Sequence, residues 1–252
     1  MKTIDLNCDL GESFGAYNIG NDEQVLSFIS SANVACGFHA GDPHVMNQTV
    51  QLAKKYDVAI GAHPGFQDLV GFGRRAMAVS PKDVYDLLLY QIGALSAFCQ
   101  AQDVKLTHVK PHGALYNMAA VDTSIAEAIA RGIANFDSSL AIYGLSGSKL
   151  IEAGEKYGLK TVSEVFADRT YQPNGTLTPR TQPNAVIHDS NDAIKQVLQM
   201  VKEQTVQAIT GEVIAIKADS ICVHGDNSHA LQFVQELRNA LTNEGITIKA
   251  IR

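Results

Sequence analysis

Acidic, basic and imidazole side chains follow a series of short apolar runs in this sequence. Carboxylates and imidazoles move protons, and a lysine ammonium stabilises negative charge that develops on a reacting oxygen. Loop glycines stand among them and let a small ligand approach the backbone closely. The side chains concerned are Asp9, Glu12, His39, His63, Arg74, Lys110, His112, Asp168, Arg169, His224 and Asp226.

The apolar runs before these residues are typical of buried strands, and amphipathic stretches with helical periodicity lie between them. Strands are expected at residues 3–8, 33–36, 58–62, 105–109, 140–143, 160–165, 219–223 and 246–251, and helices at 80–98, 190–204 and 227–243. This alternation predicts an α/β fold, a single TIM-like (β/α) barrel domain of seven or eight strands over residues 1–252. In such a barrel the residues that follow the strands share the face on which active sites are built.

The first expected strand shows which of its side chains point inward. Successive side chains of a strand point to opposite faces, so the polar Asn7 and Asp9 share one face and the apolar Leu6 and Cys8 share the other. We expect Leu6 and Cys8 to pack beneath helices and Asn7 and Asp9 to point into the barrel mouth.

Composition and charge argue against several classes of protein. A chain of 252 residues with 46% hydrophobic and 18% charged residues is ordinary for a soluble globular enzyme. The net charge of −6 and the scattered lysines and arginines argue against nucleic-acid binding. No apolar run approaches the roughly 18 residues of a membrane span, and no apolar signal segment opens the sequence, which favours a cytoplasmic location. The four cysteines are far apart, which indicates buried thiols.

Residues 166–187 interrupt the strand–helix alternation. The segment is long and polar and carries three prolines, so it is expected to be a loop that closes over the site or docks a partner. No glycine-rich phosphate-binding loop is recognisable in the sequence, since GLSGSK is too short and GFGRRA follows no strand.

Six sequence blocks, in order, resemble the LamB/YcsF family: NCDLGE, ACGFHAGDP, GAHPGFQDLVGFGRR, HVKPHGALYN, EVFADRTYQPNGTLTPR and CVHGDN. The resemblance covers about residues 1 to 252. It implies a seven-stranded barrel similar to that of the glycoside hydrolase/deacetylase group. It also implies opening of the 5-oxo-L-proline lactam to L-glutamate, ATP as co-substrate, and two partner subunits, B and C, that help to handle the ATP.

Roles for the rim residues follow from the chemistry of lactam opening. We expect Asp9 to act as general base with support from Glu12, and Lys110 to stabilise developing negative charge. The imidazoles of His39, His63 and His112 would carry or donate protons. Substrate-binding candidates are Arg74, Arg169 and Arg180, whose guanidinium groups suit a carboxylate, together with Asn7, Asp168, His224 and Asp226.

Two other interpretations stay open. Asp9, His39 and His63 would supply the carboxylate and two imidazoles of a metal-dependent amide hydrolase of the deacetylase type, and their spacing neither requires nor excludes a divalent ion. Alternatively, the chain is a non-catalytic subunit that binds a small acid and delivers it to partners.

Overall fold

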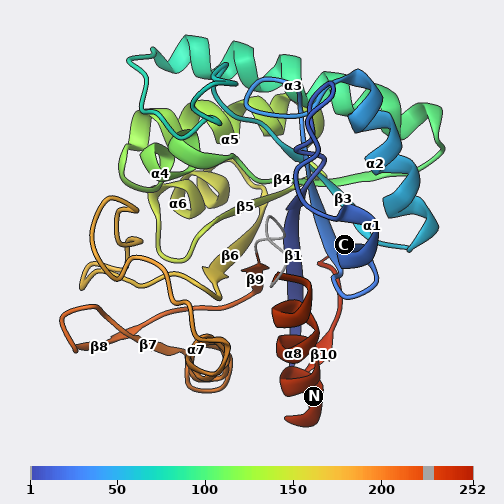
Figure 1. Cartoon of the computed structure of the whole chain (residues 1–252). Helices are drawn as coiled ribbons and strands as arrows, with labels where there is room; N and C mark the ends of the chain where they lie inside the picture. Colours follow the sequence, from blue (N-terminus) through green and yellow to red (C-terminus); the bar gives the residue numbers. More distant parts are fainter. Residues whose placement is uncertain (1, 224–229, 252) are drawn as a thin grey trace.

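Seven parallel strands close a barrel in the computed structural model, which describes residues 2–223 and 230–251. Neighbouring strands pair in chain order, and the Asp5–Cys8 stretch of the first strand pairs with the last to close the ring. Figure 1 shows these strands at the centre of the molecule. They are β1 (Thr3–Leu10), β2 (Ser31–Ala35), β3 (Ala59–His63), β4 (Leu106–Val109), β5 (Ala141–Leu145), β6 (Lys160–Phe166) and β9 (Ser220–Val223).

The predicted barrel is confirmed with seven strands, and the eighth expected strand does not join its wall. That strand shortens to β10 (Thr247–Ile248), which pairs with Thr3 and Ile4 just before the stretch of β1 that pairs with β9. Since β9 already occupies the neighbouring position along β1, the barrel closes without β10.

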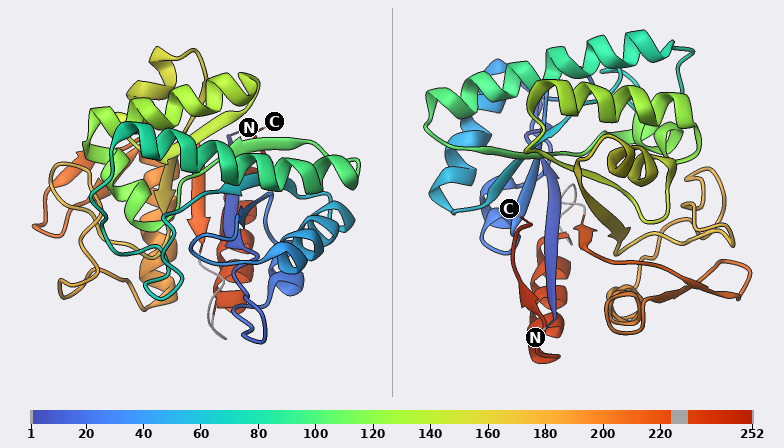
Figure 2. Two further views of the ribbon diagram at one scale, coloured as in Figure 1. Left: turned by 90° about the horizontal axis from the view of Figure 1, so that it is seen from above. Right: turned by 180° about the vertical axis from the view of Figure 1, so that it is seen from behind.

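Helices surround the barrel, as the views from above and from behind show (Figure 2). The expected helices at 80–98, 190–204 and 227–243 correspond to α3, α7 and α8, although residues 227–229 lie outside the described residues. The full set is α1 (Asp22–Leu26), α2 (Pro43–Lys55), α3 (Pro81–Ala101), α4 (Gly113–Val121), α5 (Thr123–Asp137), α6 (Lys149–Lys156), α7 (Ser190–Glu203) and α8 (Ala230–Asn243). No helix within these described residues combines the length and apolar character needed to cross a membrane.

Helix α3 illustrates how the sequence sets these boundaries. Ser80 accepts a hydrogen bond from the backbone of Asp83, and the Asp83 carboxylate accepts one from the backbone of Ser80, so the two residues form a capping box. Val84, Leu88 and Leu95 then recur at helical spacing and are fully buried against the barrel.

The barrel wall separates an apolar exterior from a largely polar interior. Leu6 and Cys8 lie in the main hydrophobic core between strands and helices, as their alternation predicts. Inside, the Asp5 carboxylate is fully buried, and burial raises its pKa above the ordinary value. It accepts hydrogen bonds from the hydroxyl groups of Ser30, Ser31, Tyr143 and Ser220.

The segment after β6 forms a packed loop beside the mouth of the barrel, in agreement with the loop expected at 166–187. Tyr171 is fully buried there, and its hydroxyl accepts a hydrogen bond from the backbone of Phe166. Residues after α7 form a small antiparallel hairpin, β7 (Thr205–Gln207) and β8 (Val213–Ala215), which is bridged to Tyr171 through Ala208. Figure 1 shows the loop and the hairpin on the same side of the barrel.

Candidate active site

A cavity of about 610 Å³ opens at the ends of the barrel strands. This volume lies within the range of small-molecule sites. Its polar lining comes from β1, from the segments after β3 and β4, and from the loop after β6. The charged and imidazole side chains in the lining are Asp9, Glu12, His63, Arg74, Lys110, His112, Arg169 and Arg180.

Lys110 is the most deeply buried cation of this site, with 2% of its surface exposed. Its Nζ lies 2.9 Å from Asp9 Oδ1 and 2.9 Å from Glu164 Oε1. It also lies 3.1 Å from the Sγ of Cys222. Burial opposes the charge, but the two carboxylates raise the pKa of Lys110 well above its ordinary value. Lys110 is therefore a fixed positive charge at the floor of the cavity.

Asp9 connects this charge to the imidazoles. Its Oδ1 accepts hydrogen bonds from Lys110 Nζ and from Asn33 Nδ2, the latter at 2.8 Å. Its Oδ2 lies 3.2 Å from the Nε2 of His63. One carboxylate oxygen is thus held by donors, and the other faces an imidazole at the cavity wall.

Three imidazoles gather beside Asp9 and Glu12. The rings of His39 and His112 stack with their centroids 3.7 Å apart, and His63 meets both rings edge-on. His112 Nδ1 lies 2.9 Å from His63 Nε2. Burial and the neighbouring imidazoles lower the pKa values of His39 and His112 well below the ordinary value, so both rings are neutral at neutral pH.

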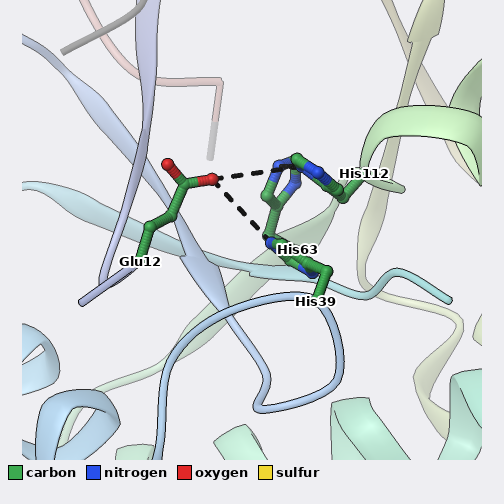
Figure 3. A group of neighbouring side chains, drawn as sticks. All are labelled: Glu12, His39, His63 and His112. Atoms are coloured by element: carbon green, nitrogen blue, oxygen red, sulfur yellow. Dashed lines mark hydrogen bonds and ion pairs between the residues drawn. The ribbon is translucent and has the colours of Figure 1, made fainter. Parts of the chain in front are cut away.

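The Glu12 carboxylate faces this cluster. Figure 3 shows it on one side of the three rings, with contacts from Glu12 Oε1 to His39 Nε2 at 3.8 Å and to His112 Nδ1 at 4.0 Å. One donor atom from each of Glu12, His39, His63 and His112 lies within 4.8 Å of every other. These four residues form a group that can hold a metal ion.

Three arginines also line the cavity. The guanidinium of Arg169 is buried and donates hydrogen bonds to the carbonyl oxygens of Thr178 at 2.6 Å and Ala185 at 3.1 Å. Burial, with the charge of Arg180 nearby, lowers the pKa of Arg169 to about 10. Arg74 lies over the ring of Phe72. Arg169 therefore holds the loop together, while Arg74 and Arg180 line the same cavity.

Comparison with known proteins shows which family the chain belongs to. The sequence model of the LamB/YcsF family matches residues 4–252. The chain belongs to this family. It is 61% identical over 252 residues to a protein of Geobacillus thermodenitrificans that is named as the A subunit of 5-oxoprolinase, and the match covers 100% of this chain and 98% of that relative. A Bacillus subtilis protein of the same name is 57% identical over 251 residues, with 100% and 98% covered.

The LamB/YcsF fold is also seen in a solved structure. The crystal structure of a lactam utilization protein from Thermus thermophilus has 47% sequence identity and a TM-score of 0.93, and the match covers 100% of both chains. The family and the barrel that the sequence predicts are thereby confirmed.

Several predicted residues of this LamB/YcsF chain lie away from the cavity wall. Asn7 is fully buried below it, donating to Glu164 and Ser220 and accepting from Asn33. His39 lies behind the other imidazoles, and Asp168 is not part of the described lining. His224 and Asp226 fall outside the described residues.

Other polar residues of the site were not predicted, because they lie in the body of later strands or in a helix rather than at the carboxyl ends of strands. Glu164 on β6 binds Lys110 and accepts a 2.7 Å hydrogen bond from the hydroxyl of Tyr116. His108 on β4 and Asn33 on β2 are hydrogen-bonded to each other at 2.8 Å. Alternation along β6 puts Glu164 on the same face as the apolar Val162 and Phe166, so the periodicity that placed Asn7 and Asp9 gave no signal of an inward carboxylate here.

Proposed function

We propose that this member of the LamB/YcsF family works as the A subunit of an ATP-dependent 5-oxoprolinase. In this reaction 5-oxo-L-proline, ATP and two water molecules give L-glutamate, ADP and phosphate. The relatives that carry the 5-oxoprolinase name support the proposal over the full length of the chain. The observation that carries it is the cavity in which Lys110 and Asp9 pair beside three imidazoles.

The lactam must be activated before water can open it. Its amide is stabilised by resonance, so water attacks the ring carbon slowly. Phosphorylation of the lactam oxygen makes that carbon electrophilic, so one water molecule can add to it and expel the ring nitrogen. This leaves an acyl phosphate, which the second water molecule hydrolyses to L-glutamate and phosphate. The protein then has to orient the ring, remove a proton from water and protonate the departing nitrogen.

Asp9 is placed to act as the general base. Lys110 and Asn33 fix its Oδ1, which leaves Oδ2 beside His63 at the wall of the cavity. A positioned base contributes about 10²–10⁴-fold to a rate. Lys110 stabilises negative charge on the attacked group. When no ion occupies their facing nitrogens, His63 and His112 return a proton to the ring nitrogen with support from Glu12, and with an ion bound the protonated Asp9 returns it.

The substrate carboxylate is assigned to the arginines of the site. Arg74 and Arg180 line the cavity, and a guanidinium group suits the planar geometry of a carboxylate. Arg169 belongs to the same loop as Arg180, and its hydrogen bonds to Thr178 and Ala185 make it a positioning residue. Asn7 positions Glu164 and Lys110 in the same way from below.

Partner subunits B and C complete the proposal. The sequence has no recognisable ATP cradle, so ATP and the activated lactam would be handled together with these subunits. The loop after β6 contributes Asn174, Thr176 and Arg180 to the cavity lining and is the proposed docking or closing element. Use of ATP fits a cytoplasmic location for the complex.

Reconstitution tests this function. The purified chain, alone and with subunits B and C, is supplied with 5-oxo-L-proline and ATP, and release of glutamate and phosphate is measured. We expect barely any turnover from the chain alone and coupled release from the complex. Turnover by the chain alone would contradict the sharing of the reaction, and a complex that releases no glutamate would contradict the function itself.

Two alternatives predict different results in the same assay. A non-catalytic subunit that only delivers a small acid predicts that Asp9→Asn leaves turnover of the complex unchanged. A metal-dependent amide hydrolase predicts turnover without ATP, and the cluster of Glu12, His39, His63 and His112 is the observation that favours it.

A further inference from the structure

The imidazole of His39 is buried without a partner. Its exposed fraction is 1%, and within residues 2–223 and 230–251 neither its Nδ1 nor its Nε2 has a hydrogen-bond partner. Buried polar groups in native proteins are almost always satisfied by protein, water or an ion. The contact of His39 Nε2 with the carboxylate of Glu12, at 3.8 Å, is too long for a hydrogen bond. His39 therefore needs a partner that these residues do not supply, such as a water molecule or an ion.

The tautomers of the two neighbouring imidazoles point to the same place. His63 Nδ1 lies 2.7 Å from the carbonyl oxygen of Lys110, and His112 Nε2 lies 2.8 Å from that of Phe72. A carbonyl oxygen only accepts, so each of these nitrogens carries the proton. The remaining nitrogens, His63 Nε2 and His112 Nδ1, face each other at 2.9 Å, and Asp9 Oδ2 lies 3.2 Å from His63 Nε2, so only acceptor atoms meet at this point unless a proton or another cation joins them. Two lone pairs at this distance require a cation between or beside them.

A shared proton does not account for the whole cluster. A proton between His63 and His112 would satisfy that contact, but it would leave both nitrogens of His39 buried and unpaired. A metal ion accepts lone pairs from all three rings at once. Metal-binding histidines usually donate the N–H of their other ring nitrogen to a carbonyl or carboxylate oxygen, which fixes the tautomer and the orientation of the ring.

We propose that Glu12, His39, His63 and His112 bind one divalent transition-metal ion. Three imidazoles and one carboxylate favour zinc, iron, cobalt, nickel or copper over manganese, magnesium and calcium, which prefer oxygen ligands. The donor atoms are separated by distances from 2.9 Å to at most 4.8 Å. A tetrahedral site with ligands at ~2.0–2.1 Å needs separations of about 3.3 Å, so small side-chain shifts complete it.

Two glycines make room for His39 in this arrangement. A β-carbon on Gly65 would lie 2.7 Å from His39 Nδ1, and one on Gly73 would lie 2.7 Å from His39 Cβ. His39 therefore packs closely against the loop that follows β3, and its Nδ1 faces Gly65. Its Nε2 faces Glu12 and is the nitrogen available to the ion.

The ion would be bound at the wall of the cavity. Glu12, His63 and His112 line the cavity, and His39 lies behind them. Binding of the ion is inferred from this geometry alone, and only its use in lactam opening rests on the proposed function. The test therefore contains no substrate, so its outcome and that of the lactam assay are independent.

Metal content and cobalt binding test the site directly. The purified full chain is dialysed and its metals are counted by elemental analysis. It is then stripped with a chelator and titrated with Co²⁺, with visible absorption and calorimetry as readouts. We expect close to one transition-metal ion per chain as purified and one Co²⁺ site with ligand-field bands after stripping.

Variants locate the site. His39→Ala and Glu12→Gln are expected to weaken Co²⁺ binding by at least about 100-fold, since even the partners that orient metal ligands are worth 10–100-fold. His188→Ala removes a histidine far along the chain, outside the cluster, and should bind Co²⁺ as the unmodified protein does. Circular dichroism checks that each variant is folded, and Glu12→Gln keeps the size of the side chain if His39→Ala does not fold. The proposal is overturned if the unmodified chain holds no stoichiometric metal and binds no Co²⁺, or if the two ligand variants bind Co²⁺ like His188→Ala.

Discussion

Replacement of Lys110 by methionine tests the charge arrangement at the floor of the cavity. Methionine preserves most of the volume of the side chain but leaves two carboxylates without their shared cation, since Nζ lies 2.9 Å from an oxygen of both Asp9 and Glu164. Removing one partner of a buried ion pair costs about 3–5 kcal/mol. For a chain of this length each kcal/mol lowers Tm by ~2–4 °C, so we expect a decrease of roughly 6–20 °C.

The measurement is urea and thermal unfolding of the variant at neutral pH, with a second substitution that relieves the damage. In Lys110→Met with Glu164→Gln one uncompensated charge is gone, so we expect part of the lost stability to return, even though Glu164→Gln alone is destabilising. The control is Lys156→Met, which removes an exposed ion pair with Glu127 and should change the free energy of unfolding far less than Lys110→Met does. The reasoning would be refuted if Lys110→Met cost no more than Lys156→Met, or if the two substitutions at the buried pair simply added.

Three further predictions concern the site and its surroundings. Asp9→Asn removes the proposed base with little change in shape, so turnover of the reconstituted complex should fall by about 10²-fold or more, and unchanged glutamate release would remove Asp9 from the mechanism. Burial raises the pKa of Asp22 from 3.8 to about 6. The folded protein therefore holds this proton more tightly than the unfolded chain, and ionisation of Asp22 lowers the free energy of unfolding as pH rises from about 4 to 6. In metal-free protein, urea titrations should find Asp22→Asn more stabilising at neutral pH than at about pH 4.5, by roughly 1–3 kcal/mol, and equal effects at both pH values would contradict the assignment. Gly61→Ala places a β-carbon against the imidazole of His108 and should lower Tm strongly. The control is Gly93→Ala, whose added β-carbon meets nothing within 4 Å, and similar Tm values for the two variants would contradict the steric argument.

The parts of the site that could be predicted from the sequence are those at the carboxyl ends of strands or directly after them. Asp9, His63 and Lys110 could be found because the carboxyl ends of parallel strands converge on one face of a barrel, and the structure brings them together there. Alternation along the first strand also placed Asn7 in the barrel interior, although it lies below the cavity rather than in its wall.

The remaining features depend on how distant segments meet. Glu164 reaches Lys110 only because β6 places it inside the barrel, and no spacing in the sequence relates the two residues. The pairing of Glu12 with His112 likewise joins loops far apart along the chain, where the sequence suggested a different set with Asp9. The β7–β8 hairpin is short and its strands pair only with each other, so it gives a weak periodic signal.

Closure of the barrel by β1 and β9 has a consequence for biosynthesis. The carboxylate of Asp5 accepts a hydrogen bond from Ser220, 215 residues further along the chain. A ribosome that adds ~5–20 residues per second needs roughly 10–40 s to supply the second partner after the first has been made. During that interval one edge of β1 lacks its neighbour β9, and the carboxylate of Asp5 lacks the hydrogen bond from Ser220. Closure of the barrel therefore waits until β9 has been made, and chaperones that shield exposed strand edges have their longest opportunity to act on this first strand.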